Sequence, residues 1–382
     1  MIRTTLFTIF LSSSLFAQAV PLVPATPTPG STETTNPAKT PAKAVVIEED
    51  PAASSSSKTD KASRTLSDSG ITLPPKGEAS VKLQIYLDQQ HFGPGIIDGK
   101  PGTFTQKAIA NYNLSKGREQ TDTRVLKEAE EKVSVTYATA IVPSTVNDYV
   151  DTSLPYKRSL QAQRKAMHYR SIGEFMAERY HTSEDLLVEL NSKKAVWGAQ
   201  PGSVLKVPNI EPFLIENLKR GRSHKTTEEL SARHVIVDTQ IKQVLIYKLQ
   251  LPNEQSNGDT VTVKAAQPKL IASFPITPGK TQFIPKGFWN LKNSYELIEW
   301  RYDQQMLDTG VRSKTGLAIP PGPNNPIGVV WNGLTKSGIG IHGTDNPRTI
   351  GRARSAGCIR LANWDAARFP NLVRPGAVVV IR

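Results

Sequence analysis

Cysteine is almost absent from this sequence: it occurs once, as Cys358, among 382 residues. A single thiol excludes an intramolecular disulfide, and no Cys/His cluster has the spacing of a zinc site. The sequence also lacks a P-loop and a basic helix with interleaved aromatic residues. Despite a net charge of +13, we therefore expect no nucleic-acid partner, and we expect neither a cofactor nor a bound metal.

Long apolar runs are also missing. The apolar stretch over residues 6–16 is too short to span a bilayer of about 30 Å. It follows Arg3 and precedes Ala-Gln-Ala at residues 17–19, an order that is typical of a secretory signal peptide with a small-residue cleavage site. We expect residues 1–19 to be a signal peptide and the mature protein to be exported, without a transmembrane segment, to the periplasm or cell-wall space. A buried N-terminal helix is the alternative.

Residues 20–79 consist mainly of Pro, Ala, Thr, Ser and Lys. Such a segment buries too little apolar surface to offset the entropy lost on ordering, so we predict a disordered linker. The total length suggests two or three domains beyond it. Residues 119–164 predict a charged helix in "TRVLKEAEEKV" and a strand in "VSVTYATAIV". We assign them no function and interpret them as a connector, and residues 211–231 as a linker.

The stretch "LQIYLDQQHFGPGIIDGKPGTFTQKAIANY" predicts a short helix, a tight glycine-rich turn and a second helix. This combination resembles the small helical peptidoglycan-binding domain of bacterial cell-wall enzymes, which we place at residues 80–118. An unrelated helical hairpin is the alternative.

Residues 165–210 predict two helices, the second capped by Ser183, followed by the strand-like "PGSVLKVPN". This order resembles the latter part of a lysin-motif (LysM) module, which binds N-acetylglucosamine-containing glycan. Only "AMHYRS" stands where the opening strand is usual. A spacer built on the same scaffold remains the alternative to a glycan-binding module.

The pattern changes from about Ala232 to alternating apolar runs, such as "RHVIVDTQIKQVLIYKL" and "GAVVVIR", with one clear helix in "NWDAARFPNLV". Alternation of this kind predicts strands. Residues 232–382 are long enough for an independent core. We therefore predict a multidomain chain that ends in a mostly-β domain.

Candidate chemistry lies in "GIGIHGTDNPRTIGRARSAGCIRL", which places His342 at the end of one strand and Cys358 near the start of the next. Two adjoining strands can bring a thiol and its base together. Gly357 permits a sharp backbone path that points amide groups at an oxyanion. Residues 311–382 contain ten Lys or Arg against two Asp or Glu, a cationic setting that we expect to lower the pKa of the thiol.

The elements "IHGT" and "SAGCIRL", preceded by "IPPGPNNPIGVVW", resemble the L,D-transpeptidase catalytic domain of the YkuD type over residues 232–382. The resemblance implies a mostly-β, sandwich-like fold and a cysteine acyl-enzyme. It makes Cys358 the nucleophile and His342 the general base and later acid. Ser355 stands where the family's serine supports the histidine, and Ala356 stands where many members carry a second histidine.

The same resemblance implies a substrate cleft whose rim comes from residues 290–330. Arg360 is expected to orient the active-site loop or to meet a substrate carboxylate. The residues assigned to substrate binding are Arg360, Gly343, Thr344, Asn324 and Tyr302.

The function implied by the resemblance is transfer of a peptidoglycan stem peptide through a Cys358 thioester. The acceptor is a second stem, which gives a 3–3 crosslink, or another amine. An L,D-carboxypeptidase that uses the same thioester, or a non-catalytic peptidoglycan-binding envelope protein, is the alternative. We expect the protein to be a monomer with peptidoglycan as its partner.

Overall fold

Two of the predicted segments lie outside the part of the chain that the structure describes. These are the signal peptide, residues 1–19, and almost all of the linker, residues 20–79. No helix in the described part is long and apolar enough to cross a membrane. The computed structural model describes residues 70–250, 256–257, 260–261, 267–280, 282–309, 311–352 and 357–382.

The first described part consists of three helices that share one core. Apolar side chains on neighbouring turns are buried between them, as the sequence pattern predicts. The helices are α2 (Glu78–Gln89), α3 (Thr103–Ser115) and α4 (Arg124–Lys132).

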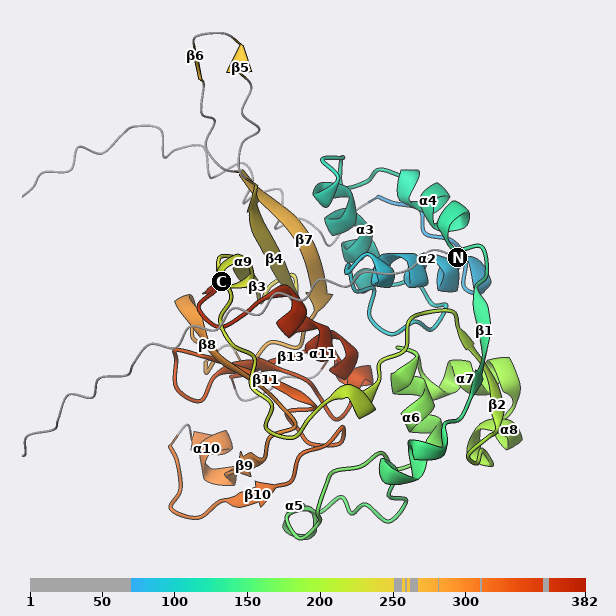
Figure 1. Cartoon of the computed structure of the whole chain (residues 1–382), viewed down its shortest axis with the longest axis vertical. Coiled ribbons are helices and arrows are strands. Elements are labelled where there is room, and N and C mark those ends of the chain that lie inside the picture. Colours follow the sequence, from blue (N-terminus) through green and yellow to red (C-terminus); the bar gives the residue numbers. More distant parts are fainter. Residues whose placement is uncertain are drawn as a thin grey trace, which may run out of the picture. The chain divides into compact units, whose positions relative to one another are not determined.

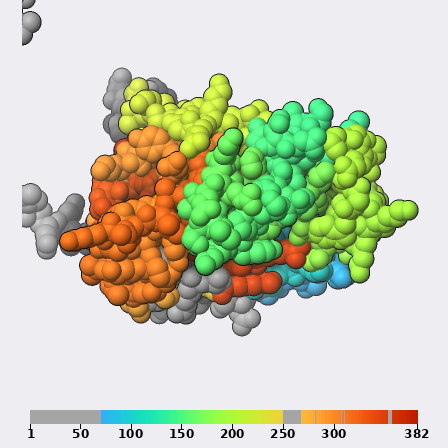
Figure 2. Space-filling view, turned by 90° about the horizontal axis from the view of Figure 1, so that it is seen from below, coloured from blue at the N-terminus to red at the C-terminus, as the bar shows by residue number. Residues whose placement is uncertain are grey.

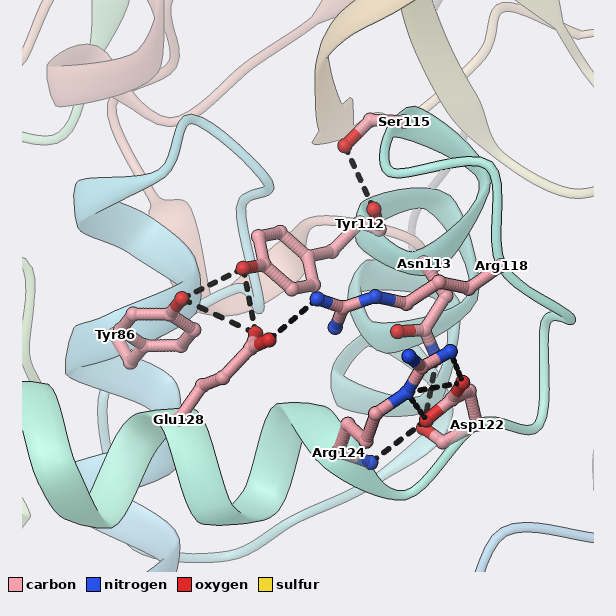
Figure 3. Close-up of polar contacts among 8 residues, drawn as sticks. All are labelled: Tyr86, Tyr112, Asn113, Ser115, Arg118, Asp122, Arg124 and Glu128. Carbon is pink, nitrogen blue, oxygen red and sulfur yellow. Dashed lines mark hydrogen bonds and ion pairs between the residues drawn. The ribbon is translucent and has the colours of Figure 1, made fainter.

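Helix α4 was not predicted to belong to this part, because it lies in the presumed connector. Its Val125 is fully buried in the shared core. Figure 3 shows Glu128 of α4 accepting hydrogen bonds from Tyr112 Oη at 2.7 Å and Arg118 Nη2 at 2.6 Å. The helical part therefore continues beyond residue 118.

A small α/β part follows, in which two antiparallel strands come before and after the helices in the sequence. Tyr137 pairs with Pro208 and Ile141 with Val204. The opening strand is absent at "AMHYRS" because it lies earlier, in the presumed connector, where "VSVTYATAIV" predicted a strand but not its place in this part. Ser183 caps the second helix as predicted, accepting a hydrogen bond from Leu186 N at 3.1 Å. The elements are β1 (Tyr137–Ile141), α6 (Ile172–Arg179), α7 (Glu184–Asn191), α8 (Lys193–Trp197) and β2 (Val204–Pro208).

Residues 142–170, here called the β1–α6 connection, pack against the C-terminal part. Met167 N donates a hydrogen bond to Pro321 O at 2.9 Å, and Asn324 N donates one to Met167 O at 3.0 Å. In Figure 2 the green surface of this connection lies against the orange surface near residues 300–320. The connection contains η3 (Ser144–Asp148) and α5 (Arg158–Gln161).

The C-terminal part is built on an eight-stranded mixed sheet in the order β13-β12-β11-β8-β14-β3-β4-β7. Figure 1 shows its edge strand β7 beside β4. The pairs β12–β13 and β14–β3 are parallel, and the other neighbours are antiparallel. The strands are β3 (His234–Asp238), β4 (Gln243–Gln250), β7 (Gln267–Pro275), β8 (Gly287–Glu296), β11 (Val330–Leu334), β12 (Gly340–His342), β13 (Ile359–Arg360) and β14 (Val378–Ile381).

Alternating apolar residues explain which face of this sheet is buried. Val235 and Val237 of β3 and Val244 and Ile246 of β4 are all inaccessible to solvent. The prediction of a mostly-β C-terminal domain is confirmed. The remaining elements are η4 (Ile215–Asn217), α9 (Glu228–Ser231), β5 (Ser256–Asn257), β6 (Thr260–Val261), β9 (Trp300–Tyr302), α10 (Gln304–Thr309), β10 (Leu317–Ile319), η5 (Pro347–Thr349) and α11 (Asn363–Leu372).

The presumed linker, residues 211–231, is an ordered segment that packs against β8. Glu296 of β8 accepts hydrogen bonds from Arg222 Nη2 at 2.6 Å and binds His224 Nε2 at 2.8 Å. The segment therefore belongs to the sheet part.

Candidate active site

The sheet brings His342 and Cys358 to one place. His342 is the last residue of β12, which lies between β11 and β13. Because β12 and β13 are parallel, with Ile341 opposite Ile359, Cys358 immediately precedes the strand beside the histidine. Cys358 Sγ contacts Gly338 O at 3.5 Å. Both side chains line one cavity of about 370 Å³.

The contacts of His342 determine its tautomer. Its Nδ1 lies 2.6 Å from Gly343 O, and a carbonyl oxygen can only accept, so the proton is on Nδ1. In the neutral ring Nε2 then carries no proton. The backbone of Ile327 also contacts the imidazole and, like Gly343 O, favours its protonated form. The imidazole is buried and stacks on Trp331, with ring centroids 5.5 Å apart.

Burial, reinforced by the positive charge of Arg360, lowers the pKa of His342 to about 3. Burial also raises the pKa of the Cys358 thiol, although the Gly340 backbone and Arg360 act in the opposite direction. The expectation of a lowered thiol pKa is therefore wrong, because desolvation outweighs the nearby positive charge. At neutral pH the two side chains are therefore a neutral thiol and a neutral imidazole.

Two glycines allow the backbone around the cysteine to adopt its path. Gly357 has φ +106°, a left-handed conformation that side chains rarely adopt. A Cβ atom on Gly279 would lie 2.4 Å from Gly357 Cα. Thr277 and Arg360 exchange two backbone hydrogen bonds of 3.0 Å. The segment that carries Gly279 therefore lies along the edge of β13 opposite to β12 and packs against the backbone beside Cys358.

Two predicted substrate-binding residues, Arg360 and Tyr302, line the cavity with Cys358. Arg360 is half-buried, and its Nε has no hydrogen-bond partner among the residues described. A guanidinium group in this position is suited to a carboxylate. Ser355, predicted to support the histidine, lies outside the described residues.

The other three predicted substrate-binding residues do not line this cavity. Gly343 and Thr344 are buried against Asn363, whose Oδ1 accepts a hydrogen bond from Thr344 N at 3.2 Å. Asn324 donates hydrogen bonds to His168 O at 2.8 Å and Glu174 Oε1 at 3.0 Å. Their contacts hold loops together, so the structure places them outside the Cys358 cavity.

A family model of the L,D-transpeptidase catalytic domain (YkuD) matches residues 255–381. The match includes β12, β13 and all the residues that line the Cys358 cavity except Arg158. These residues form an L,D-transpeptidase catalytic domain. Its sheet also contains β3 and β4, which precede residue 255, so the folded domain begins closer to the predicted start at residue 232.

Two bacterial relatives support the assignment over a short segment. YkuD of Bacillus licheniformis, a candidate L,D-transpeptidase, is 46% identical over 61 residues, which are 16% of this chain and 37% of the relative. YkuD of Bacillus subtilis is 46% identical over 59 residues, 15% of this chain and 36% of the relative. The chain thus covers little more than a third of their length.

A solved L,D-transpeptidase from Mycobacterium smegmatis is 13% identical to this chain. The alignment covers 48% of this chain and 75% of that one. Its TM-score of 0.28 is too low to support the assignment.

Sequence reasoning missed two contributors to the cavity of the transpeptidase domain. Trp331 lines the cavity and stacks on His342. Arg158 lines the same cavity although it lies in the β1–α6 connection, far from the domain in sequence. No local signal indicates Arg158, because only tertiary packing brings it there.

No group of three or more histidine, cysteine or acidic residues within the described ranges is arranged to bind a metal ion. The chemistry that the cavity offers is that of the thiol, the imidazole and the surrounding arginines.

Proposed function

We propose that this protein is a cysteine-dependent L,D-transpeptidase that acts on peptidoglycan stem peptides. The observation that supports the proposal is that Cys358 and His342 line one cavity, with Nδ1 of the imidazole occupied by Gly343 O. In the proposal, the unprotonated Nε2 is the base that a thiol nucleophile needs.

In the proposed reaction, Cys358 Sγ bonds to the carbonyl carbon that precedes the terminal D-alanine of a tetrapeptide stem, and the thiol proton passes to His342 Nε2. Backbone amides at Gly357 and Cys358 stabilise the oxyanion, and Ser355 supports the histidine. The carbon–nitrogen bond then breaks, and His342 returns the proton to the departing amine of D-alanine. A thioester remains on Cys358.

An amine of a neighbouring stem then attacks the thioester. Its proton passes to His342 and on to the departing sulfur, so the enzyme is restored and a 3–3 crosslink is formed. Attack by water instead would make the protein an L,D-carboxypeptidase. The energy of the cleaved peptide bond is kept in the thioester, so no nucleotide is required.

The rest of the chain fits this role in the proposal. The protein is exported as a monomer to the periplasm or cell-wall space. The helical part and the LysM-like α/β part bind peptidoglycan, which raises the effective concentration of substrate at the catalytic domain.

Intact-mass analysis tests the proposed chemistry. We expect the folded wild type to gain the mass of the acyl group from a stem tetrapeptide, or from a carbapenem whose strained amide carbonyl reacts with thiols. Cys358→Ala removes the nucleophile, so it should show no adduct and lose activity by roughly a thousandfold or more. If the folded wild type gains no mass with either reagent, the protein is a non-catalytic binding protein.

Adding a second stem distinguishes the acceptors. A crosslinked dimer in the product spectrum supports transpeptidation, whereas a tripeptide stem as the only product indicates hydrolysis.

A further inference from the structure

We propose that Arg158, which lies outside the catalytic domain, binds a carboxylate of the stem peptide in the Cys358 cavity and selects substrates by their charge. The inference rests on the proposed function and assigns part of the substrate recognition to the β1–α6 connection, a segment without any predicted role.

The position of Arg158 is the first observation. It is the first residue of α5, and it lines the cavity that also contains Cys358 and His342. About a third of the side chain is accessible to solvent (31%). The side chain is therefore accessible to a ligand that enters the cavity, while the guanidinium partners Gln161 and Asp345 line an adjoining pocket that Arg158 also borders.

The second observation is that this side chain is held in place. Arg158 Nη1 donates a hydrogen bond to Gln161 Oε1 at 2.7 Å, and Gln161 Nε2 donates one to Pro155 O at 2.8 Å. Gln161 is almost fully buried. The hydrogen bonds of Met167 with Pro321 and Asn324 fix the connection to the catalytic domain. A positioned guanidinium group loses little side-chain entropy when it binds a carboxylate.

The third observation is the charge of the cavity. Its acidic residues are already engaged, because Glu299 pairs with Arg220 at 2.9 Å and Asp303 with Arg301 at 3.4 Å. Arg312 and Arg360 line the cavity as well, so its walls carry more positive than negative charge.

The ion pair between Arg158 and Asp345 is weak enough for a ligand carboxylate to replace it. Its ion pair with Asp345 is long, at 3.7 Å, and Asp345 is itself 30% exposed. Such a partly solvated pair is weak. A stem peptide presents several carboxylates, and a bidentate contact with one of them is stronger than this pair.

The test compares stem tetrapeptides whose carboxylates are free or amidated one at a time. For the free stem, we expect Arg158→Gln to raise KM at least about tenfold, with kcat within about twofold of the wild type. For one amidated stem, the wild type and Arg158→Gln should have the same KM, because the contact is already missing. Arg158→Lys keeps the charge without the bidentate geometry and should lie between the two.

Two further variants separate substrate binding from a structural role. Arg164→Gln removes a cation from the same connection, and Arg164 does not line the cavity, so its kinetics should equal those of the wild type. Asp345→Asn removes the ion-pair partner but keeps the guanidinium group, so KM should not rise. A rise equal to that of Arg158→Gln would show that the ion pair only holds the connection in place, and would overturn the inference.

The outcomes also separate this inference from the proposed function. A wild type that is inactive on every stem contradicts the proposed function. An active wild type whose Arg158→Gln variant has an unchanged KM, or is impaired equally on free and amidated stems, overturns the role of Arg158 alone.

Discussion

His342 and Cys358 line one cavity, and desolvation of the two side chains keeps both of them uncharged at neutral pH. Cysteine nucleophiles are often activated as thiolates by a positive environment. Here Arg360 favours the thiolate, but desolvation has the larger effect on the thiol and also lowers the pKa of the histidine. In the proposed mechanism, proton transfer therefore accompanies the attack of the sulfur.

This charge state predicts an unusual pH profile for acylation. Since the pKa of His342 is lowered to about 3, the base stays neutral, and we expect kcat/KM to be level between about pH 5 and pH 8. In His342→Gln the reaction depends on the small thiolate fraction, so its slower rate should rise about tenfold per pH unit. A wild-type rate that falls away below an inflection near pH 6.5 would contradict a desolvated histidine.

Helix α6 connects the α/β part to the catalytic domain through a buried carboxyl group. Glu178 accepts hydrogen bonds from Tyr169 Oη at 2.8 Å and from Asn363 Nδ2 at 3.0 Å. Asn363 in turn accepts from Thr344 N, in the turn that follows His342. Burial raises the pKa of Glu178 to about 8, so the group is mostly protonated at neutral pH.

The direction in which the free energy of unfolding changes with pH follows from comparing Glu178 in the folded and unfolded chains. The folded chain retains the Glu178 proton up to about pH 8, whereas the unfolded chain releases it near 4.5. The stabilisation is fully present below pH 4.5 and is lost as the pH rises through about 8. In Glu178→Gln, the decline of the free energy of unfolding over this range should be shallower by up to about 1.4 kcal/mol per pH unit.

Urea denaturation at several pH values measures this difference. Glu189→Gln on α7 changes an exposed carboxylate and should leave the slope as in the wild type. Equal slopes for all three proteins would show that Glu178 is ionised in the folded chain.

The helical part, the α/β part and the catalytic domain meet at one buried charge network. Arg368 Nη2 of α11 pairs with Asp88 Oδ1 of α2 at 2.6 Å and with Asp365 Oδ1 at 2.5 Å. His181 Nδ1 lies 3.1 Å from Asp88 Oδ2. Although burial opposes it, the charges of Arg368 and His181 hold the pKa of Asp88 well below its usual range. One arginine thus compensates carboxylates from two parts of the chain.

Removal of this arginine should destabilise the folded chain strongly. Arg368→Ala leaves buried carboxylates without their cation, and we expect the free energy of unfolding to fall by about 3–5 kcal/mol. Arg220→Ala breaks the exposed pair with Glu299 and should cost less than about 1 kcal/mol. Equal urea midpoints for the two variants would show that the network adds no more than a surface ion pair.

Local pattern was sufficient for many features of this chain. Alternating apolar residues predicted the strands of the C-terminal domain, and Ser183 predicted a helix cap. The spacing of His342 and Cys358 placed them on adjoining strands, because residues this close in sequence can be brought together by a single loop. The helix α4 and the strand β1 were assigned to a connector, because each is completed by a partner that lies far from it in the sequence.

The sequence by itself determined the main strands of the C-terminal domain and the proximity of His342 and Cys358 to one another, since these depend on periodicity and short spacing. Only the tertiary structure decided that Arg158 enters the cavity, that Gly279 packs on Gly357, and that Asn324 and Thr344 lie outside. It also decided the charge state of the thiol, because desolvation depends on how all the surrounding segments pack around the sulfur.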